Sequence, residues 1–167
     1  MFADNKKYNF SFNGTKIIIS KKDHDTEFHP YAKALVYALY HTQYRTIRVE
    51  PQVDDRYTPD LCALDDGGTV ILWAEVGNFS LDKIEKLIKK YRRAHFVFVK
   101  EERDLLIFNK HLDKLAKEVH TLPLIEIIVY PEHFKDWNVS EEGDVFIRKE
   151  DVNIIRWHVP KGHVDHF

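Results

Sequence analysis

Cysteine is nearly absent from this chain: Cys62 is the only one, so no internal disulfide bond can form. Cys62 lies in an apolar segment, and free cysteines are among the most often buried residues, so we expect it in the core. No apolar stretch approaches the ~20 residues that a membrane-spanning helix requires, and the first ten residues contain no apolar signal segment. These absences predict a protein of the reducing cytoplasm that does not enter a membrane.

An excess of positive charge is also missing, since 25 Lys and Arg face 27 Asp and Glu for a net charge of −2. A global basic field is therefore excluded, and any phosphate binding must come from a local patch. Glycine-rich phosphate loops, nucleophile elbows and dinucleotide fingerprints are absent, which removes support for NTP hydrolysis, acyl transfer and dinucleotide chemistry. The 167 residues suit one core, so we expect a single domain over residues 1–167.

Segments of strand periodicity alternate with segments of helical periodicity along the chain. Strands are expected at residues 8–12 and 15–20 around an Asn-Gly turn, and then at 44–50, 61–64, 70–74, 94–100, 124–130, 144–148 and 153–157. Helices are expected at 30–42, 80–93 and 110–119, with 105–108 as an edge strand or turn. This order predicts an α/β (α+β) fold with a mixed central sheet, and terminal β-hairpins that pack together as a small second sheet.

The segment 59–93 holds the main candidate residues. Two apolar runs flank an Asp-Asp-Gly-Gly turn, which is typical of a β-hairpin. If the loop is Gly67-Gly68, Asp60 lies directly opposite Glu75; if it is Asp66-Gly67, the two carboxylates are diagonal neighbours. Both registers place them on one face of the sheet, and a one-residue bulge would separate them.

Two acids that face each other on apolar strands destabilise a sheet unless a partner compensates them. A bound cation is the usual compensation, and hard oxygen ligands suit Mg²⁺ or Mn²⁺. A lysine-rich helix follows Glu75 directly, and two acids with a nearby lysine are typical of metal-assisted phosphodiester hydrolysis. The alternative is that Asp60 and Glu75 are ordinary exposed residues at the sheet edge.

The order of these motifs resembles the PD-(D/E)xK nuclease-like superfamily and, more narrowly, the YaeQ family of bacterial proteins. The resemblance covers roughly residues 24–100 and rests on Tyr37-Ala38-Leu39, Pro59-Asp60-Leu61, Leu72-Trp73-Ala74-Glu75-Val76-Gly77 and the helix with Lys83 and Lys86. It implies a restriction-endonuclease-like αβββαβ core. It also implies a divalent-metal-dependent nuclease or phosphodiesterase activity.

The resemblance implies a metal site and two catalytic acids. Asp60 and Glu75 would bind Mg²⁺ or Mn²⁺, with the main-chain carbonyl of Val76 as the usual third ligand. Glu27 or Asp25, just before the first long helix, is a candidate for an additional acid. A capping or loop role is the alternative for that residue.

The sequence departs from the superfamily at the catalytic lysine. The superfamily pattern has lysine two residues after the second acid, and this chain has Gly77 there. The resemblance implies that Lys83 or Lys86, on the next helix, steadies the phosphate instead. The excess of positive charge on the helix 83–93 could contact a nucleic-acid backbone, and a solvated face is the alternative. A second hypothesis is an inactive nuclease-like scaffold that binds nucleic acid or protein. The sequence does not discriminate a monomer from a dimer.

Overall fold

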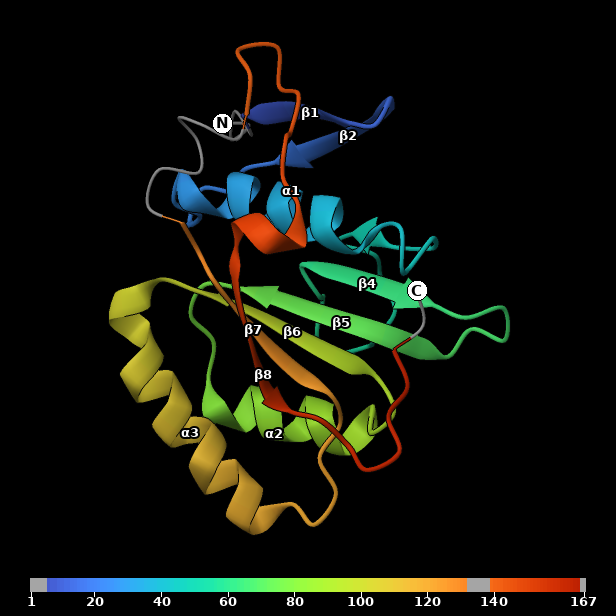
Figure 1. The fold of residues 1–167 in the computed structure, drawn as a ribbon, viewed down its shortest axis with the longest axis vertical. Helices are drawn as coiled ribbons and strands as arrows, with labels where there is room; N and C mark the ends of the chain where they lie inside the picture. Colours follow the sequence, from blue (N-terminus) through green and yellow to red (C-terminus); the bar gives the residue numbers. More distant parts are fainter. Residues whose placement is uncertain (1–5, 132–138, 166–167) are drawn as a thin grey trace.

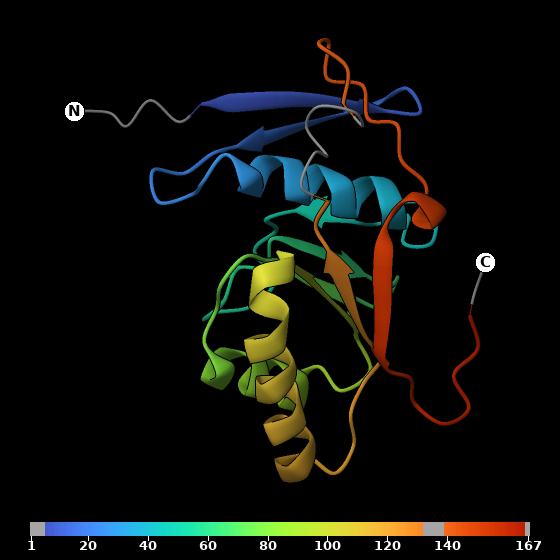
Figure 2. The ribbon, with the colours of Figure 1, turned by 60° about the vertical axis from the view of Figure 1, so that its left-hand side comes forward.

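The structure, a computed structural model, describes residues 6–131 and 139–165. Its elements stack in layers, with a small hairpin above a helix, then a six-stranded sheet, then two further helices (Figures 1 and 2). In chain order they are β1 (Lys7–Phe12), β2 (Thr15–Ser20), α1 (Phe28–Tyr40), β3 (Arg48–Val49), β4 (Leu61–Leu64), β5 (Val70–Val76), α2 (Leu81–Lys90), β6 (His95–Lys100), η1 (Glu102–Asp104), α3 (Leu105–Glu118), β7 (Ile125–Val129), η2 (Lys149–Asp151) and β8 (Asn153–His158).

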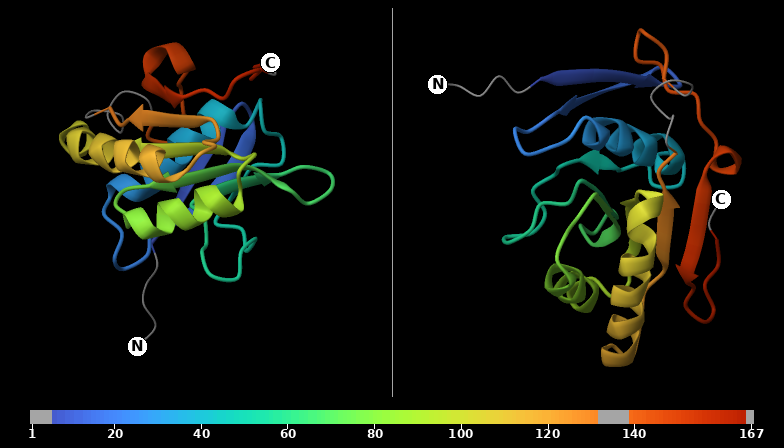
Figure 3. Two further views of the ribbon diagram at one scale, coloured as in Figure 1. Left: turned by 90° about the horizontal axis from the view of Figure 1, so that it is seen from below. Right: turned by 90° about the vertical axis from the view of Figure 1, so that its left-hand side faces the viewer.

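The large sheet has the strand order β3-β4-β5-β6-β7-β8. Strands β3, β4 and β5 are antiparallel, β5, β6 and β7 are parallel, and β8 is antiparallel to β7. Parallel neighbours need crossover connections, and α2 and α3 supply them from the same side of the sheet (Figure 3). The carboxyl ends of the three parallel strands therefore meet at one edge. The prediction of a mixed sheet flanked by helices is confirmed.

Helix α1 is buried on two sides, although its periodicity indicates one apolar face. Nine of its thirteen residues are buried. The cause is the β1–β2 hairpin, which covers the face of α1 that points away from the sheet (Figure 1). Phe10 and Ile19 of the hairpin join one core with Leu35 of α1 and Leu72 of β5. Helix α1 is thus clamped between two sheets, which fixes any side chain it extends toward the large one.

Three local predictions are wrong. The strand expected at 44–50 shrinks to Arg48–Val49, because Tyr44 N–H bonds the Tyr40 carbonyl and continues the end of α1 as turns. Residues 105–108 form the first turn of α3 rather than an edge strand or isolated turn. Residues 144–148 form no strand; there the structure has isolated bridges, such as that between Ser11 and Asp144.

The terminal hairpins do not pack together as a second sheet. The small sheet consists of β1 and β2. Strand β8 instead joins the large sheet, where Ile154 and Ile155 pair with Ile128 and Ile127 of β7. Residues 139–152, which precede β8, pair with β1 only locally, through hydrogen bonds of Ser11 with Gly143 and Val145. None of the helices in the described ranges is both long and apolar enough to cross a bilayer.

Candidate functional site

The β4–β5 hairpin brings Asp60 opposite Glu75. Their neighbours Leu61 and Ala74 are paired, so the next residues outward are Asp60 and Glu75. The turn matches neither predicted two-residue loop, because the N–H of Asp65 bonds the Thr69 carbonyl and leaves three residues, 66–68, in the loop. Gly68, the last of them, adopts a φ of +80°. A bulge between the turn and the acids shifts the register by one residue and leaves the acids opposite each other, whereas the sequence suggested that a bulge would separate them.

Asp60 is held from two directions. Its Oδ2 accepts a 2.7 Å hydrogen bond from the Val76 N–H, and its Oδ1 lies 3.2 Å from Nζ of Lys33. Lys33 extends from the clamped helix α1 and is only 1% exposed. The N–H and C=O of one strand residue point to the same side, so the Val76 carbonyl faces the edge where Asp60 lies. Asp60 and the Val76 carbonyl therefore lie on the same side of β5.

Glu75 is buried on the face that α2 covers. Its Oε1 accepts hydrogen bonds from Nε1 of Trp73 at 2.8 Å and from Nζ of Lys83 at 2.9 Å. Burial, and then the charge of Asp60, raise the pKa of Glu75 to about 7, although Lys83 and Trp73 act in the opposite direction. Positive charge around Glu75 is therefore too small to offset its burial and its acidic neighbour.

A third acid, Glu50, completes the cluster and was missed from the sequence. Its Oε1 lies 2.9 Å from Nζ of Lys33 and 3.1 Å from Nζ of Lys22, and its N–H bonds the Asp60 carbonyl. Burial would raise the pKa of Glu50, but the two lysines outweigh it and the pKa is lowered. Glu50 also has a φ of +47°, and such strained non-glycine residues concentrate at functional sites. The sequence signal was an acid followed by proline at the end of a predicted strand.

Only some of the other predicted site residues lie near Asp60 and Glu75. Lys83 reaches Glu75, whereas Lys86 is paired with Asp82 on the exposed face of α2, at 2.7 Å. Glu27 accepts a hydrogen bond from the Tyr8 hydroxyl and so faces the hairpin rather than the acids. Asp25, the alternative to Glu27, accepts from the N–H of Lys22 within its own loop. The structure thus brings Asp60, Glu75, Val76 and Lys83 together.

Lys100, at the end of β6, was also missed. Its Nζ donates a 2.6 Å hydrogen bond to the Gly77 carbonyl and lies over the rings of Phe79 and Phe108, at 4.1 and 4.6 Å from their centroids. Lys100 is 4% exposed. Burial lowers its pKa to about 8, against the attraction of Asp104 and Glu75. The sequence signal was a charge that ends an otherwise apolar strand run.

The positive charges of α2 are largely paired within the protein. The ion pairs are Lys83 with Glu75, Lys86 with Asp82, Lys89 with Glu85, and Lys90 with Asp54. A phosphate backbone would have to compete with these partners along the helix 83–93. The surface of α2 is therefore less cationic than its sequence indicates.

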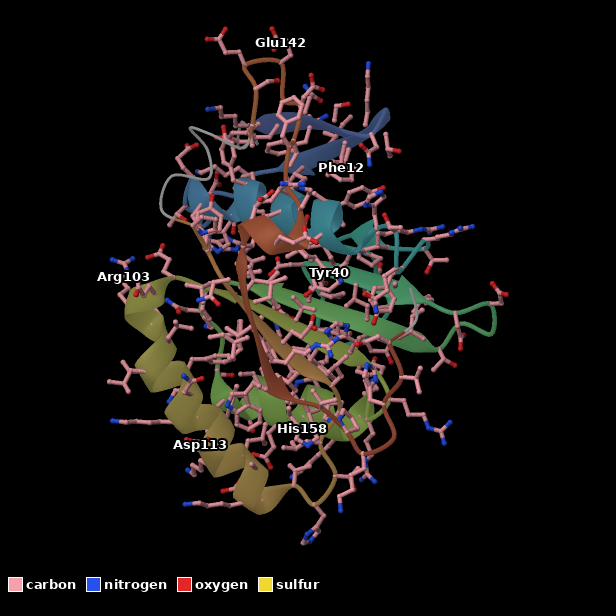
Figure 4. All side chains as sticks on the ribbon, in the orientation of Figure 1. Phe12, Tyr40, Arg103, Asp113, Glu142 and His158 are labelled. Carbon is pink, nitrogen blue, oxygen red and sulfur yellow. The ribbon has the colours of Figure 1, made fainter. Side chains whose placement is uncertain are left out.

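A second buried cluster lies at the other end of the sheet, near the labelled Tyr40 (Figure 4). There Glu126 accepts from the Tyr40 hydroxyl at 2.5 Å, pairs with His95 at 2.9 Å and bonds Arg156 at 3.2 Å. Burial would raise the pKa of Glu126, yet His95 and Tyr40 overcome it and hold the pKa at about 2. Donors from α1, β6 and β8 converge on this one carboxylate and tie the three elements to β7, so this cluster has the character of a structural network.

The residues at the first cluster suit a divalent cation of the Mg²⁺ type. No group of three or more His, Cys, Asp or Glu side chains suited to a metal occurs within residues 6–131 and 139–165. Mg²⁺ does not need such a cage, because it usually binds one or two carboxylates and keeps several waters. Asp60, Glu75 and the Val76 carbonyl provide that set, and a bound cation would oppose the burial and the Asp60 charge that raise the pKa of Glu75.

Comparison with known proteins shows a shared fold. No protein-family model and no curated protein matches this sequence. Among solved structures, the chain is similar to YaeQ protein from Pseudomonas syringae, with a TM-score of 0.58, 17% identity and coverage of 77% of this chain and 74% of that one. It is also similar to YaeQ protein from Xanthomonas axonopodis pv. citri, with a TM-score of 0.53, 14% identity and coverage of 76% and 74%. The chain therefore has the fold of the YaeQ proteins, which the order of its motifs predicts.

Proposed function

We propose that the chain is a YaeQ-type member of the PD-(D/E)xK nuclease-like superfamily and hydrolyses phosphodiester bonds with bound Mg²⁺ or Mn²⁺. The observation that carries this proposal is the pair Asp60 and Glu75, opposed at the carboxyl end of β5. The order α1-β3-β4-β5-α2-β6 supports it, because it is the αβββαβ order of the restriction-endonuclease-like core. Likeness of fold alone does not determine activity, so the proposal depends on the site.

The chain's own residues have distinct roles in this proposal. A bound cation would supply Lewis-acid stabilisation and a more acidic water. Lys33 orients Asp60 through its 3.2 Å contact, and the Val76 N–H fixes the second oxygen of the same carboxylate. Lys83, 2.9 Å from Glu75, lies close enough to place its charge beside a phosphate that approaches the acids.

A binding scaffold without hydrolytic activity is the second candidate. One observation favours it: Lys33 and Lys83 already contact Asp60 and Glu75, so both acids have cationic partners without a metal. Such a protein would fold and bind its partner without any response to Mg²⁺. The missing lysine at Gly77 points in the same direction.

A thermal melt separates the two candidates. Wild-type protein and Glu75→Gln are melted in parallel with EDTA, Mg²⁺ or Mn²⁺. The phosphodiesterase proposal expects a metal-dependent rise in Tm for the wild type that Glu75→Gln lacks, since a ligand of the folded state stabilises it. Hydrolysis of single-stranded and duplex oligonucleotides is then assayed with both proteins. Equal Tm in all three conditions for the wild type would favour the scaffold.

A further inference from the structure

A pocket of about 340 Å³ opens beside the candidate site, where β5 and β6 end. The start of α1 and the segment 101–104, which contains η1, form its walls, and Figure 4 labels Arg103 at this end of the molecule. The residues that line it and matter here are His24, His29, Gly77, Asn78, Lys100 and Arg103. We propose that this pocket binds the phosphate group of a phosphodiester, with Lys100 and His29 as the hydrogen-bond donors. The inference rests on the proposed function, for which it supplies a substrate-binding site.

Lys100 is a buried cation that lacks a matching anion. Among the described residues, no carboxylate lies within ion-pair distance of its Nζ, and its hydrogen bond goes to the neutral carbonyl of Gly77. An ammonium group has three protons to donate, so donor capacity remains. Buried charges are normally paired, because an isolated one is costly. The lowered pKa of Lys100 agrees with this deficit. The rings of Phe79 and Phe108 hold the side chain in place at the pocket wall.

His29 offers a second donor. Its Nδ1 lies 3.1 Å from the Thr26 main-chain nitrogen, which can only donate, so Nδ1 accepts. The proton of the neutral ring then belongs to Nε2. Nε2 lies over Gly77, where an added Cβ would be only 2.8 Å away. Gly77 permits this approach and has a φ of +83°, which favours glycine. Because Gly77 has no side chain, the Nε2 N–H of His29 can lie at the end of β5, where Lys100 also donates to Gly77.

The other charges around the pocket set its preference for a monoanion. Arg103 is paired with Glu101 at 2.7 Å, so these two largely cancel each other. Asp104 acts on Lys100 beyond ion-pair distance. The first turn of α1 contains no acid, and helix amino termini favour anions. The pocket lining therefore holds two cations, Lys100 and Arg103, and two acids, Glu101 and Asp104. A lining without excess positive charge suits the single negative charge of a phosphodiester better than a polyanion.

Dimethyl phosphate is a minimal phosphodiester that tests the pocket without a metal. The full chain is melted in EDTA at constant ionic strength with dimethyl phosphate up to about 50 mM, and with acetate in a parallel series. We expect dimethyl phosphate, and not acetate, to raise the Tm of the wild type. Lys100→Met should fold with an equal or higher Tm, because it removes a buried charge and keeps the aliphatic stem, while its affinity falls about tenfold or more. Lys89→Met, which removes an exposed and paired lysine of α2, should bind like the wild type.

His29→Leu provides a second variant, and it should weaken the same shift. Unchanged affinity in Lys100→Met, equal stabilisation by acetate, or no shift in the wild type would each overturn the phosphate pocket. Failure here is distinguishable from failure of the proposed metal site. Lys100→Met keeps Asp60, Glu75 and Val76, so its Mn²⁺-dependent rise in Tm should persist if the metal proposal is correct.

Discussion

Lys33 and Asp60 form an ion pair of 3.2 Å that joins α1 to the edge of the large sheet. The same Nζ also lies 2.9 Å from Glu50, so one buried ammonium is shared by two carboxylates at the two ends of the loop between β3 and β4. Attraction to these acids outweighs the burial that would lower the pKa of Lys33, and that pKa is raised. The ion pair thus connects helix α1, which packs under the hairpin, to the acids of the candidate site.

Removal of the Lys33 charge should destabilise the fold strongly. Lys33→Met keeps the length and apolar stem of the side chain but leaves Glu50 and Asp60 close together without their shared cation. We expect a loss of about 3 kcal/mol in the free energy of unfolding, the magnitude typical of a broken buried pair. Urea denaturation at pH 7 measures it. The variant Lys33→Met/Glu50→Gln removes one repelling charge and should recover part of the loss. A change below about 1 kcal/mol in the single variant would contradict this role.

Glu75 should make stability decrease with rising pH in a defined range. Its pKa is raised from 4.5 to about 7, so the folded protein binds this proton more tightly than the unfolded chain does. The corresponding stabilisation is complete below pH 4.5 and is lost as the pH rises through 7. In EDTA, Glu75→Gln should therefore gain stability relative to the wild type between these pH values, by an amount on the order of 2 kcal/mol.

The measurement is urea unfolding at several pH values from 4.5 to 8, with both proteins in EDTA. Glu85→Gln, at an exposed pair of the same region, serves as the control and should follow the wild-type curve. Parallel curves for wild type and Glu75→Gln would show that Glu75 titrates normally. The raised pKa of Glu75 would then no longer be an argument for a cation at this site.

The sequence predicted those features that depend on short-range pattern. The Asn13-Gly14 turn adopts φ values of +47° and +78°, as expected for a hairpin of this type. The hairpin pattern placed Asp60 and Glu75 at the same end of two adjacent strands, but the turn and the bulge that set their register were not predicted. The sequence left Lys83 and Lys86 open, although the helical wheel already placed Lys83 at the border of the apolar stripe and Lys86 further round.

The missed residues depend on contacts between distant segments. Lys33 is buried where it reaches Glu50 and Asp60 at the end of the large sheet, and no local periodicity in 28–40 indicates that contact. Glu50 joins the acids through a positive φ and a hydrogen bond to Asp60. Lys100 reaches Gly77 because β6 is parallel to β5, and strand order is not encoded in either strand alone. A sequence pattern identifies candidates, whereas tertiary packing decides which of them meet.

Gly77 should be more sensitive to substitution than a glycine of similar backbone conformation. Gly77→Ala places a methyl group 2.8 Å from Nε2 of His29 at a φ of +83°. Gly68→Ala is the matched control, since its φ is +80° and nothing lies within 4 Å of an added Cβ. The control should lose about 1 to 2 kcal/mol from the left-handed backbone alone. Gly77→Ala should lose more, because His29 must move away from the end of β5 as well.

Urea unfolding of the two variants measures the difference, and the double variant Gly77→Ala/His29→Ala assigns its cause. Once the ring is absent, the extra loss at Gly77 over Gly68 should disappear, because only the backbone penalty remains. If Gly77→Ala and Gly68→Ala lose equal stability, the His29 ring does not pack on Gly77. The N–H of Nε2 would then not be directed toward the carboxyl end of β5, and Lys100 would be the only donor at that position.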